Sequence, residues 1–342
     1  MEAHLRSRAL VLNRFGLEGL ALEDRPVPEP GPGEALVKVH AVSLNRRDLL
    51  LVEGTYAPRQ PFPVVVGSDA AGEVVSAGEG VDIVPGTRVL VPFFPQWSNG
   101  DLTREAMWPV YGDGICGDGV FRDHITVPAE ALIPLPEYLT FEEAATLPCA
   151  GATAWSALTD FETFKPGDRL LVQGTGGVSV FALQFARMLG LSVVITSSSD
   201  EKLETARALG ADGLVNYRTD AGWAQAARSL AGGPVDAVID VGGTETLDAS
   251  IRMLKPNGTA FLVGVLSGAS ASILLPLVVM RRVRLQGVTV ASVASTRRMV
   301  EAVGDAGLKP VIGETFPLER YRDAFQAMRD NRVFGKIVMT LD

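Results

Sequence analysis

The spacing of apolar residues changes in the middle of the chain. The segment LLVQ at 170–173 is almost continuously apolar, as expected of a strand buried on both faces of a parallel sheet. Glycines follow, and apolar side chains then recur at i, i+3, i+4, i+7, i+8 and i+11, the spacing of one helix face. These side chains are Val178, Phe181, Ala182, Phe185, Ala186 and Leu189. The pattern predicts a strand over 167–174 and a helix over 176–190.

The same alternation continues to about residue 265. Strand-like runs occur at 191–197, 213–217, 235–243 and 259–265, and helical patterns occur at 199–211 and 221–230. Strands that alternate with helical patterns of roughly 10–15 residues indicate βαβ units. This part of the chain is therefore predicted to be an α/β domain with a parallel sheet.

The remaining sequence is rich in Val, Gly and Pro. Turn residues followed by alternating apolar positions occur at 27–44, 63–81 and 85–93, which predicts short strands. Near the C-terminus, 319–331 has the pattern of an amphipathic helix and 334–342 that of a closing strand. The organisation predicts a β-rich domain over 1–145, an inserted α/β domain over 146–288, and a return to the first domain over 289–342.

Three glycines join the first strand of the α/β domain to its helix. They are Gly174, Gly176 and Gly177, and Val178 follows them. Glycines let backbone N–H groups approach a pyrophosphate, and a helix N-terminus adds unpaired donors and a positive dipole end. Ser179 stands where the fingerprint has its third glycine, and it is small enough for close packing. The strand–turn–helix context predicts a dinucleotide site.

The second strand ends in ITSSSDEK, where an acidic residue would bind the ribose 2′-hydroxyl of NAD. Ser197 occupies that place, Ser198 follows, and Lys202 lies one helical turn further on. Hydroxyls and a lysine suit a 2′-phosphate, so NADPH is favoured over NADH. The alternative is that Ser198 and Glu201 form a capping box that only begins a helix. Asp200 and Glu201 also keep NAD open.

The composition limits the classes of binding partner and the cellular compartment that we expect for this protein. The formal net charge of −9 argues against nucleic acid or an anionic membrane as the main partner. The two cysteines, Cys116 and Cys149, exclude a disulfide framework and suit a reducing compartment. The N-terminal segment lacks an apolar region of signal-peptide length, and the stretch ILLPLVVM is too short to span a bilayer. We expect a cytoplasmic protein.

Four longer segments resemble one family over nearly the whole chain. They are PGPGEALVKVHAVSLNRRDLLLVEGTYAP, GSDAAGEVVSAGEGV, LPCAGATAW and LVQGTGGVSVFALQFAR. They are similar to the first strands, the glycine-rich strand pair, the domain entry and the coenzyme turn of the medium-chain dehydrogenase/reductase superfamily. The quinone oxidoreductase and zinc-free alcohol-dehydrogenase-like branches are the most similar. The resemblance implies a GroES-like catalytic domain, a Rossmann domain, a cleft between them, and a homodimer or homotetramer.

The resemblance also implies further coenzyme contacts. Thr153 is expected near the nicotinamide and Tyr217 near the adenosine phosphate, and Lys336 in the FGK segment is expected to complete the cleft. The other implied contacts are Val241, Gly242, Gly264, Val265 and Leu266.

The zinc-dependent members hold their catalytic metal with Cys, His and Cys. The matching positions here are Asn45, Ser68 and Cys149. An amide and a hydroxyl are poor zinc ligands, and the one remaining thiol cannot form a zinc site. The neighbouring carboxylate of Asp69 does not supply the missing ligands. A metal-free protein is therefore predicted. Cys149 is interpreted as a buried core thiol rather than a nucleophile.

Without a metal there is no Lewis acid to polarise an alcohol or a ketone. A quinone or an α,β-unsaturated carbonyl (enone, enal or enoyl thioester) needs less help, because an electron-poor carbon accepts hydride directly. Tyr56, in the segment Gly54-Thr55-Tyr56, is the candidate proton donor by resemblance, with a loop-packing role as the alternative. Asn45 is expected to hydrogen-bond the substrate or the nicotinamide ribose, and Asp48 to hold the loop.

Arg46 and Arg47 are interpreted as surface charges, although Arg47 stands where zinc-dependent relatives carry a hydroxyl proton relay.

A small apolar substrate is expected, because two segments that would line its pocket, 93–118 and 267–280, contain large apolar side chains. These are Trp97, Trp108, Tyr111, Leu274 and Leu275. The leading prediction is an NADPH-dependent quinone or enoyl reductase. A metal-free alcohol/ketone oxidoreductase and a non-catalytic NADPH-binding protein are the alternatives.

Overall fold

The computed structural model describes residues 6–108, 110–113 and 117–341, so Cys116 lies outside the described residues. The chain divides into two compact units. The first unit comprises residues 1–152 and 291–342, and the second comprises residues 153–290. The boundaries predicted from the sequence lie after residues 145 and 288, whereas the two units meet after residues 152 and 290.

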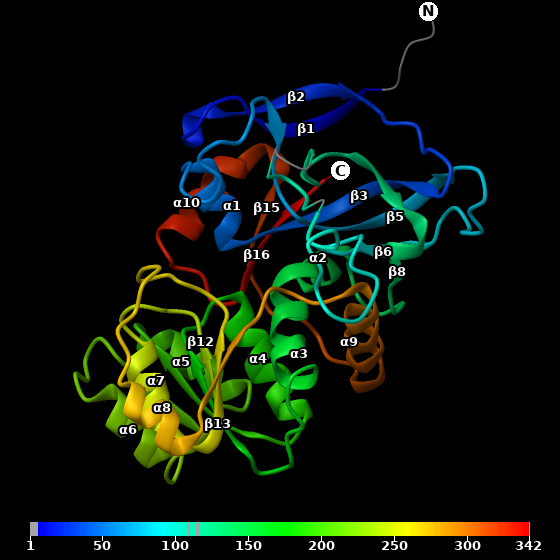
Figure 1. Cartoon of the computed structure of the whole chain (residues 1–342). Coiled ribbons are helices and arrows are strands. Elements are labelled where there is room, and N and C mark those ends of the chain that lie inside the picture. Colours follow the sequence, from blue (N-terminus) through cyan, green and yellow to red (C-terminus); the bar gives the residue numbers. More distant parts are fainter. Residues whose placement is uncertain (1–5, 109, 114–116, 342) are drawn as a thin grey trace, which may run out of the picture. The chain divides into compact units, whose positions relative to one another are not determined.

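The first unit contains two sheets (Figure 1). The larger has the order β15-β16-β3-β5-β6-β8, with β7 also paired to β3, and the smaller has the order β2-β1-β4. The strands of the larger sheet are β3 (Glu34–Leu44), β5 (Asp69–Ala77), β6 (Arg88–Val91), β7 (His124–Pro128), β8 (Ile133–Pro134), β15 (Ile312–Pro317) and β16 (Lys336–Thr340). Those of the smaller are β1 (Arg6–Leu12), β2 (Leu20–Pro26) and β4 (Val64–Val65).

Short helices cover these sheets. They are α1 (Arg46–Val52), α2 (Phe141–Ala145), α9 (Val293–Ala306), α10 (Tyr321–Arg329), the 3₁₀ turns η1 (Leu17–Gly19), η2 (Ala129–Ala131) and η4 (Leu318–Arg320), and the π-turn η3 (Leu147–Gly151). The predicted C-terminal helix is α10, and its face packs into the core of this unit: Tyr321 and Phe325 are buried there and Met328 packs against it. The GroES-like β-rich domain predicted from the sequence is thus present.

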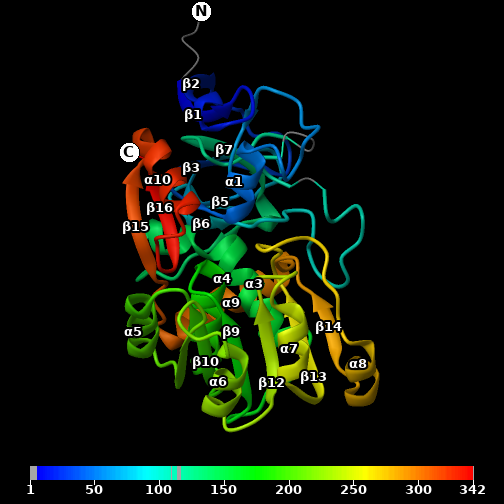
Figure 2. The ribbon, with the colours of Figure 1, turned by 90° about the vertical axis from the view of Figure 1, so that its left-hand side faces the viewer.

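The second unit is a Rossmann-type domain. Its six strands are all parallel and have the order β11-β10-β9-β12-β13-β14, part of which is visible in Figure 2. The strands are β9 (Arg169–Gln173), β10 (Ser192–Ser197), β11 (Gly213–Asn216), β12 (Val235–Asp240), β13 (Leu254–Leu262) and β14 (Arg284–Gly287). The strand order reverses at β9, whose neighbours are β10 and β12. In such sheets ligands bind outside the carboxyl ends of the strands at this switch point.

Helices cover both faces of this sheet. They are α3 (Ala152–Thr159), α4 (Gly177–Met188), α5 (Asp200–Ala208), α6 (Trp223–Leu230), α7 (Leu247–Met253) and α8 (Leu275–Arg281). The predicted face of α4 is buried through Phe181, Ala182, Phe185 and Ala186, whereas Val178 is only partly buried. Among the described residues, no helix is long and apolar enough to cross a membrane.

Candidate functional site

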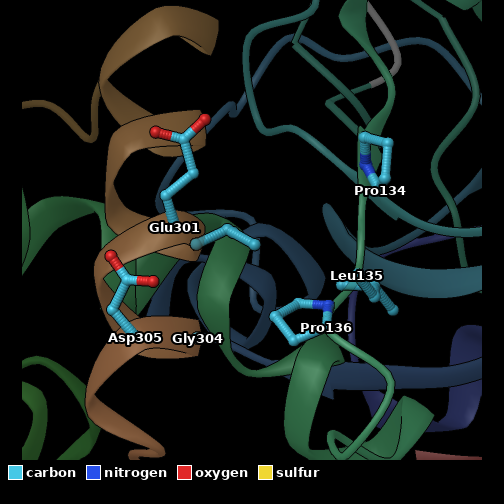
Figure 3. A pocket seen from close by; sticks show the side chains of 7 residues that line it. Pro134, Leu135, Pro136, Glu301, Gly304 and Asp305 are labelled. Carbon is cyan, nitrogen blue, oxygen red and sulfur yellow. The ribbon is translucent and has the colours of Figure 1, made fainter.

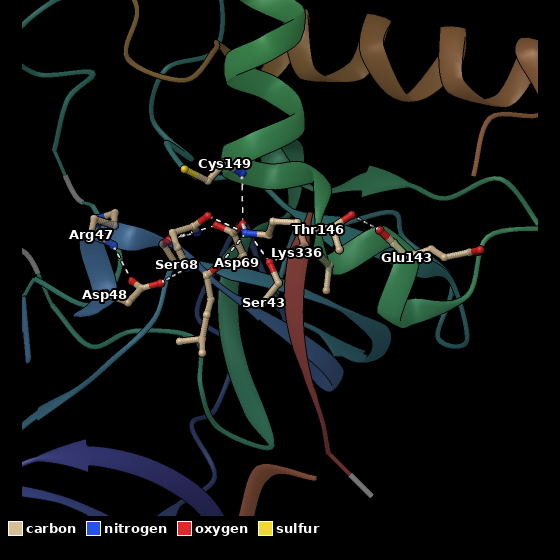
Figure 4. Close-up of polar contacts among 12 residues, drawn as sticks. Ser43, Arg47, Asp48, Ser68, Asp69, Glu143, Thr146, Cys149 and Lys336 are labelled. Carbon is tan, nitrogen blue, oxygen red and sulfur yellow. Dashed lines mark hydrogen bonds and ion pairs between the residues drawn. The ribbon is translucent and has the colours of Figure 1, made fainter. Parts of the chain in front are cut away.

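Strand register brings distant polar residues together in the first unit. Ser43 on β3 is paired with Val338 on β16 and with Asp69 on β5. The carboxyl end of β3, the start of β5 and the start of β16 therefore lie at one end of the sheet. Asn45 follows β3 directly and Lys336 is the first residue of β16, so their side chains meet there. Figure 4 shows Lys336 beside Asp69 and Ser43 in this region.

Lys336 is the centre of this polar cluster. Its side chain is 3% exposed, and its Nζ donates to the carbonyl oxygen of Leu44 at 2.8 Å and to Asn45 Oδ1 at 2.6 Å. A third contact joins Nζ to Asp69 Oδ2 at 3.5 Å. The three N–H bonds of an ammonium group are thereby all directed at protein acceptors. The predicted coenzyme contact of Lys336 stays a prediction, and in this arrangement its charge is directed inward.

Asp69 is fully buried and accepts from several sides. Ser68 Oγ donates to Oδ1 at 3.1 Å, and Ser43 Oγ and the backbone N–H of Cys149 lie 3.2 and 3.3 Å from Oδ2. The last contact comes from the π-turn η3, which directs the Cys149 amide toward the carboxylate. A buried carboxylate needs such partners, because an unpaired one would cost far more than the lost hydrogen bonds.

The beginning of α1 completes the cluster. The backbone N–H of Asn45 donates to Asp48 Oδ2 at 2.8 Å, which is the carboxylate half of a capping box. This contact agrees with the loop-holding role expected of Asp48. The amide of Asn45 also contacts the polar cluster: its Oδ1 accepts from Lys336 and its Nδ2 lies 3.4 Å from Ser68 Oγ. Burial raises the pKa of Asp48 to about 6, although the neighbouring Arg47 guanidinium acts to lower it.

These residues do not fit a zinc ion. Two of the three expected ligand positions hold Asn45 and Ser68, whose amide and hydroxyl are weak zinc ligands. The Lys336 ammonium is hydrogen-bonded to Asn45 Oδ1, so a cation of the protein's own already lies within this group. Among the described residues, no group of three His, Cys, Asp or Glu side chains is arranged to hold a metal.

The thiol of Cys149 is poorly suited to act as a nucleophile. Burial, with the nearby charge of Asp69 as a further cause, raises the pKa of this thiol well above its usual range. The thiolate is the reactive form, so a raised pKa leaves the sulfur inert near neutral pH.

Arg47 was expected at the surface, and that expectation is wrong. Arg46 is exposed, but the Arg47 side chain is only 8% exposed. Its Nη1 lies 3.4 Å from Asp48 Oδ1 and 3.2 Å from the carbonyl oxygen of Tyr111. Neighbouring residues of a helix point in directions about 100° apart, and the direction of Arg47 leads to the carbonyl oxygen of Tyr111.

Tyr56 lies over this arginine. The guanidinium carbon of Arg47 is 5.0 Å from the centroid of the Tyr56 ring, within the range of a cation–π contact. Tyr56 itself is 51% exposed, so its phenol is accessible to solvent. The structure thus gives the predicted donor a cationic neighbour that the sequence did not reveal.

In the second unit, the predicted glycine turn lies at the switch point of the sheet. Gly174 has φ +75°, a conformation that favours glycine, and it follows β9 directly. The first hydrogen bond of the α4 region runs from Val180 N to Gly176 O at 2.9 Å, so the amides of Gly176, Gly177 and Val178 precede it. A Cβ added at Gly176 would meet nothing within 4 Å. The turn therefore has open space in front of unpaired donors and fits a pyrophosphate.

The serines after β10 differ from the expected capping pattern by one residue. Ser199, not Ser198, caps α5, because its side chain accepts from the backbone N–H of Lys202 at 3.3 Å. Ser197 is buried, and its Oγ lies 3.2 Å from Thr175 Oγ1 in the glycine turn. The hydroxyl of Ser198 is therefore not used as the helix cap. The serine cluster thus adjoins the turn, as a site for adenosine ribose requires.

The other predicted coenzyme residues follow neighbouring strands. Val241 and Gly242 come directly after β12, and the run Gly264, Val265 and Leu266 comes shortly after β13. Val265, Leu266 and Tyr217 are exposed, whereas Thr153 is buried. These placements are compatible with the predicted contacts and do not test them.

Asp240 is a residue that sequence analysis missed. It is fully buried at the end of β12, and its Oδ1 accepts from the backbone N–H groups of Gly242 and Gly243 at 3.1 and 2.9 Å. Its Oδ2 accepts from Ser250 Oγ at 2.6 Å. These bonds fix the loop after β12 beside the glycine turn. Its position at a strand end, with two glycines after Val241, was the available signal.

A separate hollow of about 430 Å³ lies in the first unit between α9 and the segment after β8 (Figure 3). It is lined by Pro134, Leu135, Pro136, Val300, Glu301, Gly304 and Asp305. Its charged groups are two carboxylates from α9, and neither the polar cluster nor the glycine turn contributes to it. It is not a candidate for hydride or proton transfer.

Comparisons with known proteins place the whole chain. The family model described as "Alcohol dehydrogenase GroES-like domain" matches residues 31–137, and the one described as "Zinc-binding dehydrogenase" matches residues 177–305. A "zinc-type alcohol dehydrogenase-like protein" of Schizosaccharomyces pombe is 38% identical over 96% of both chains.

Two solved structures show the same fold. One, described as an NAD-dependent alcohol dehydrogenase, is 35% identical, has a TM-score of 0.89, and is matched over 98% of this chain and 100% of its own. The other, the crotonyl-CoA carboxylase/reductase AntE in complex with NADP, is 26% identical with a TM-score of 0.88, over 98% and 94% of the two chains.

Proposed function

Because the chain belongs to the medium-chain dehydrogenase/reductase superfamily, we propose that it is a metal-free, NADPH-dependent reductase of quinones or α,β-unsaturated carbonyl compounds. The family makes it an oxidoreductase with a nucleotide coenzyme. The finer statement rests on the residues of this chain, and chiefly on the ammonium of Lys336 within the polar cluster.

That ammonium supports a reaction that needs no Lewis acid. A divalent cation placed near Asn45 and Asp69 would be repelled by a buried ammonium that already bonds to both. Simple alcohols and ketones depend most on a polarising metal, whereas an enone or a quinone offers an electron-poor carbon. The donor set therefore favours a conjugated acceptor, even though several relatives carry zinc in their names.

Residues of the second unit support the choice of coenzyme. The amides of Gly176, Gly177 and Val178 would hold the pyrophosphate, and the hydroxyl of Ser198 and the ammonium of Lys202 would hold a 2′-phosphate. No carboxylate replaces Ser197 at the end of β10. When bound, the coenzyme supplies the hydride.

Tyr56 would supply the proton. Hydride addition to a conjugated carbonyl or a quinone leaves negative charge on the acceptor, which a phenol O–H can stabilise and then neutralise. The exposed phenol of Tyr56 can be reached by a substrate. Asn45 has both ends of its amide engaged by Lys336 and Ser68, so we assign it to positioning the polar cluster.

One set of assays tests this proposal. NADPH and NADH oxidation should be followed against 1,4-benzoquinone, 2-alkenals, 3-penten-2-one and simple ketones, with zinc measured on the same sample. We expect turnover with the conjugated acceptors, a preference for NADPH, and substoichiometric zinc. Stoichiometric zinc with faster turnover of alcohols would show the alcohol/ketone alternative, which the names of the relatives favour. Tight NADPH binding without any turnover would show a non-catalytic binding protein.

We also propose that the protein assembles with a second copy of itself. Strand β14 ends the sheet of the second unit, and α8 beside it exposes Leu275, Val279 and Met280. A free strand edge next to an exposed apolar helix face tends to be covered, and a two-fold axis lets one surface cover its own copy. Light scattering should show a dimer or a larger assembly, and Met280→Asp should weaken it. A monomeric wild type would refute the proposal.

A further inference from the structure

The guanidinium of Arg47 is buried but only half used. Its Nη1 faces Asp48 Oδ1 and the carbonyl oxygen of Tyr111. Its Nε and Nη2 are both buried and have no hydrogen-bond partner among the described residues. Unpaired buried donors are uncommon and cost free energy, so a pair of them on one side chain requires an explanation.

The two unpaired atoms lie on the same edge of the guanidinium. An arginine presents Nε–H and one N–H of Nη2 side by side, with the spacing of the two oxygens of a carboxylate. The opposite edge of Arg47 is the one held by the protein. The fold therefore fixes the plane of the group and leaves free the edge that can bind a planar anion through two hydrogen bonds.

The carboxylate closest to Arg47 cannot take this role. Asp48 Oδ1 faces Nη1, and Asp48 Oδ2 accepts the backbone N–H of Asn45. Burial lowers the pKa of the Arg47 guanidinium, but the charge of Asp48, and then the charge and a side-chain hydrogen bond of Tyr56, raise it. The net direction is upward, so the group remains a cation. An additional anion would thus meet an intact positive charge in a largely desolvated place.

Two aromatic rings decide the side from which a ligand comes. The Arg47 guanidinium carbon lies 5.0 Å from the ring centroid of Tyr56 and 5.2 Å from that of Phe93. Phe93 is 5% exposed, whereas half of Tyr56 is exposed. The exposed side of this arrangement is therefore the one at Tyr56, and a ligand would approach from there. Rings that flank the guanidinium favour a flat anion over a tetrahedral one.

We propose that the Nε/Nη2 edge of Arg47 binds a carboxylate group of the substrate, so that the preferred acceptors are conjugated carbonyl compounds that carry a carboxylate. The assignment of acceptors rests on the proposed reductase function, whereas the carboxylate site does not. The sequence predicts a small apolar substrate, and the carboxylate site adds one anionic end to that apolar body. Tyr56 then lies beside the bound molecule.

A binding experiment without coenzyme tests the site alone. Calorimetric titration of the full chain should compare 4-oxopentanoate with its methyl ester, which has the same skeleton and no charge. We expect the acid to bind at least about tenfold more tightly than the ester, the size of a charge-assisted hydrogen-bonded pair. Equal affinities of wild type for acid and ester would overturn the proposal.

Three variants assign the preference to one residue. Arg47→Gln should bring the affinities for acid and ester within about twofold of each other. Arg47→Lys keeps a charge but not the two-donor edge, so it should retain only part of the preference. Arg59→Gln removes an exposed arginine from the same loop as Tyr56 and should retain all of it. Circular dichroism checks that each variant folds. If Arg47→Gln does not fold, the acid preference of wild type and its partial loss in Arg47→Lys still test the proposal. An acid preference that survives in the folded Arg47 variants would place the site elsewhere.

A kinetic experiment separates this proposal from the reductase function. With NADPH, (E)-4-oxo-2-pentenoate and its methyl ester are both activated acceptors, and the acid should have the higher kcat/KM by about 10- to 100-fold in wild type and not in Arg47→Gln. Reduction of both without an acid preference would refute the carboxylate site and leave the reductase. Tight, Arg47-dependent binding of 4-oxopentanoate without any reduction would refute the reductase and leave the site.

Discussion

The polar cluster around Lys336 and the glycine turn after β9 are both rich in hydrogen-bond donors, but their donors are used differently. In the polar cluster, each N–H of the ammonium has an acceptor from the protein, and the carboxylate of Asp69 is surrounded by donors. In the turn, the amides of Gly176 and Gly177 precede the first helical hydrogen bond, and a Cβ added at Gly176 would meet no atom within 4 Å. The first region is complete without a ligand, and the second is not.

The polar cluster therefore contributes to the stability of the fold, whereas the glycine turn is available to bind a ligand. Side chains that satisfy one another in a buried place hold the fold together, and removing one leaves its partner unpaired. Backbone donors at an open helix N-terminus contribute little to the stability of the fold and can donate hydrogen bonds to a bound anion. Arg47 combines both situations, because one edge of its guanidinium is held by the protein and the other edge is free. Substitutions in the two regions should therefore separate into effects on unfolding and effects on binding.

Lys336→Met should have the largest effect, on stability. The change keeps most of the side-chain volume but leaves the buried carboxylate of Asp69 without its cation. Breaking a buried ion pair from one side costs about 3–5 kcal/mol, which urea unfolding monitored by circular dichroism can measure. The added substitution Asp69→Asn should recover part of the loss, because it removes the unpaired charge.

Lys309→Met is the matched control for Lys336→Met. Lys309 lies 3.4 Å from Glu143 in the same unit, and its side chain is 64% exposed, whereas that of Glu143 is 13% exposed. A pair whose cation is exposed to solvent is worth about 1 kcal/mol, so the control should unfold nearly as wild type does. Equal losses for Lys336→Met and Lys309→Met would mean that the buried pair contributes nothing specific.

Asp48 gives the polar cluster a pH dependence. Its folded-state pKa of about 6 lies above the value near 4 of an unfolded chain, so the folded state binds more protons between these values. Stability from this group is therefore complete below about pH 4 and is lost as the pH rises through 6. Asp48 faces Arg47 on its own helix, Asp69 on β5 and Lys336 on β16.

Comparison with Asp48→Asn isolates this titration. The variant does not titrate, so the free energy of unfolding of wild type should fall relative to that of Asp48→Asn by about 1–3 kcal/mol between pH 4 and pH 6.5. Urea unfolding at several pH values measures the difference. A difference that is flat over this range would show that the Asp48 carboxyl is not perturbed.

The two regions also differ in how well the sequence predicts them. The glycine turn is local: Gly174, Gly177 and the helix face at Phe181 lie within one strand–turn–helix segment, so periodicity and turn chemistry identify it. The polar cluster joins Asn45 and Lys336, which are 291 positions apart. That contact depends on the pairing of β16 with β3, which no local pattern encodes.

Two local errors have physical causes as well. Three serines follow one another at 197–199, and each could begin a helix by capping, so local chemistry did not single out Ser199. In α1, nearly every position is buried, including Arg47, Leu49 and Val52. A helix of seven residues without an exposed face gives no periodic signal, so the burial of Arg47 could not be predicted.

Gly176→Ala should change coenzyme binding and leave the fold unchanged. The residue has φ −80°, which alanine adopts without strain, and its Cβ would meet no protein atom within 4 Å. That Cβ would instead occupy the space in front of the turn, so the dissociation constant of NADPH should rise by roughly tenfold or more. Fluorescence titration measures it, with Gly287→Ala, another open position in the same unit, as control. An unchanged affinity would mean that the pyrophosphate lies elsewhere.

Lys202→Met should have the smallest effect and the most selective one. The ammonium would pair with a 2′-phosphate at the end of β10, and such a partly exposed charge pair is worth about 1 kcal/mol, or roughly fivefold in affinity. NADH lacks that phosphate, so its dissociation constant should stay within about twofold while that of NADPH rises. Lys255→Met, which removes a lysine paired with Asp236 in the same unit, controls for the loss of net charge. If Lys202→Met weakened both coenzymes equally, Lys202 would act on the shared part of the molecule, and the preference for NADPH would have to come from Ser198 alone.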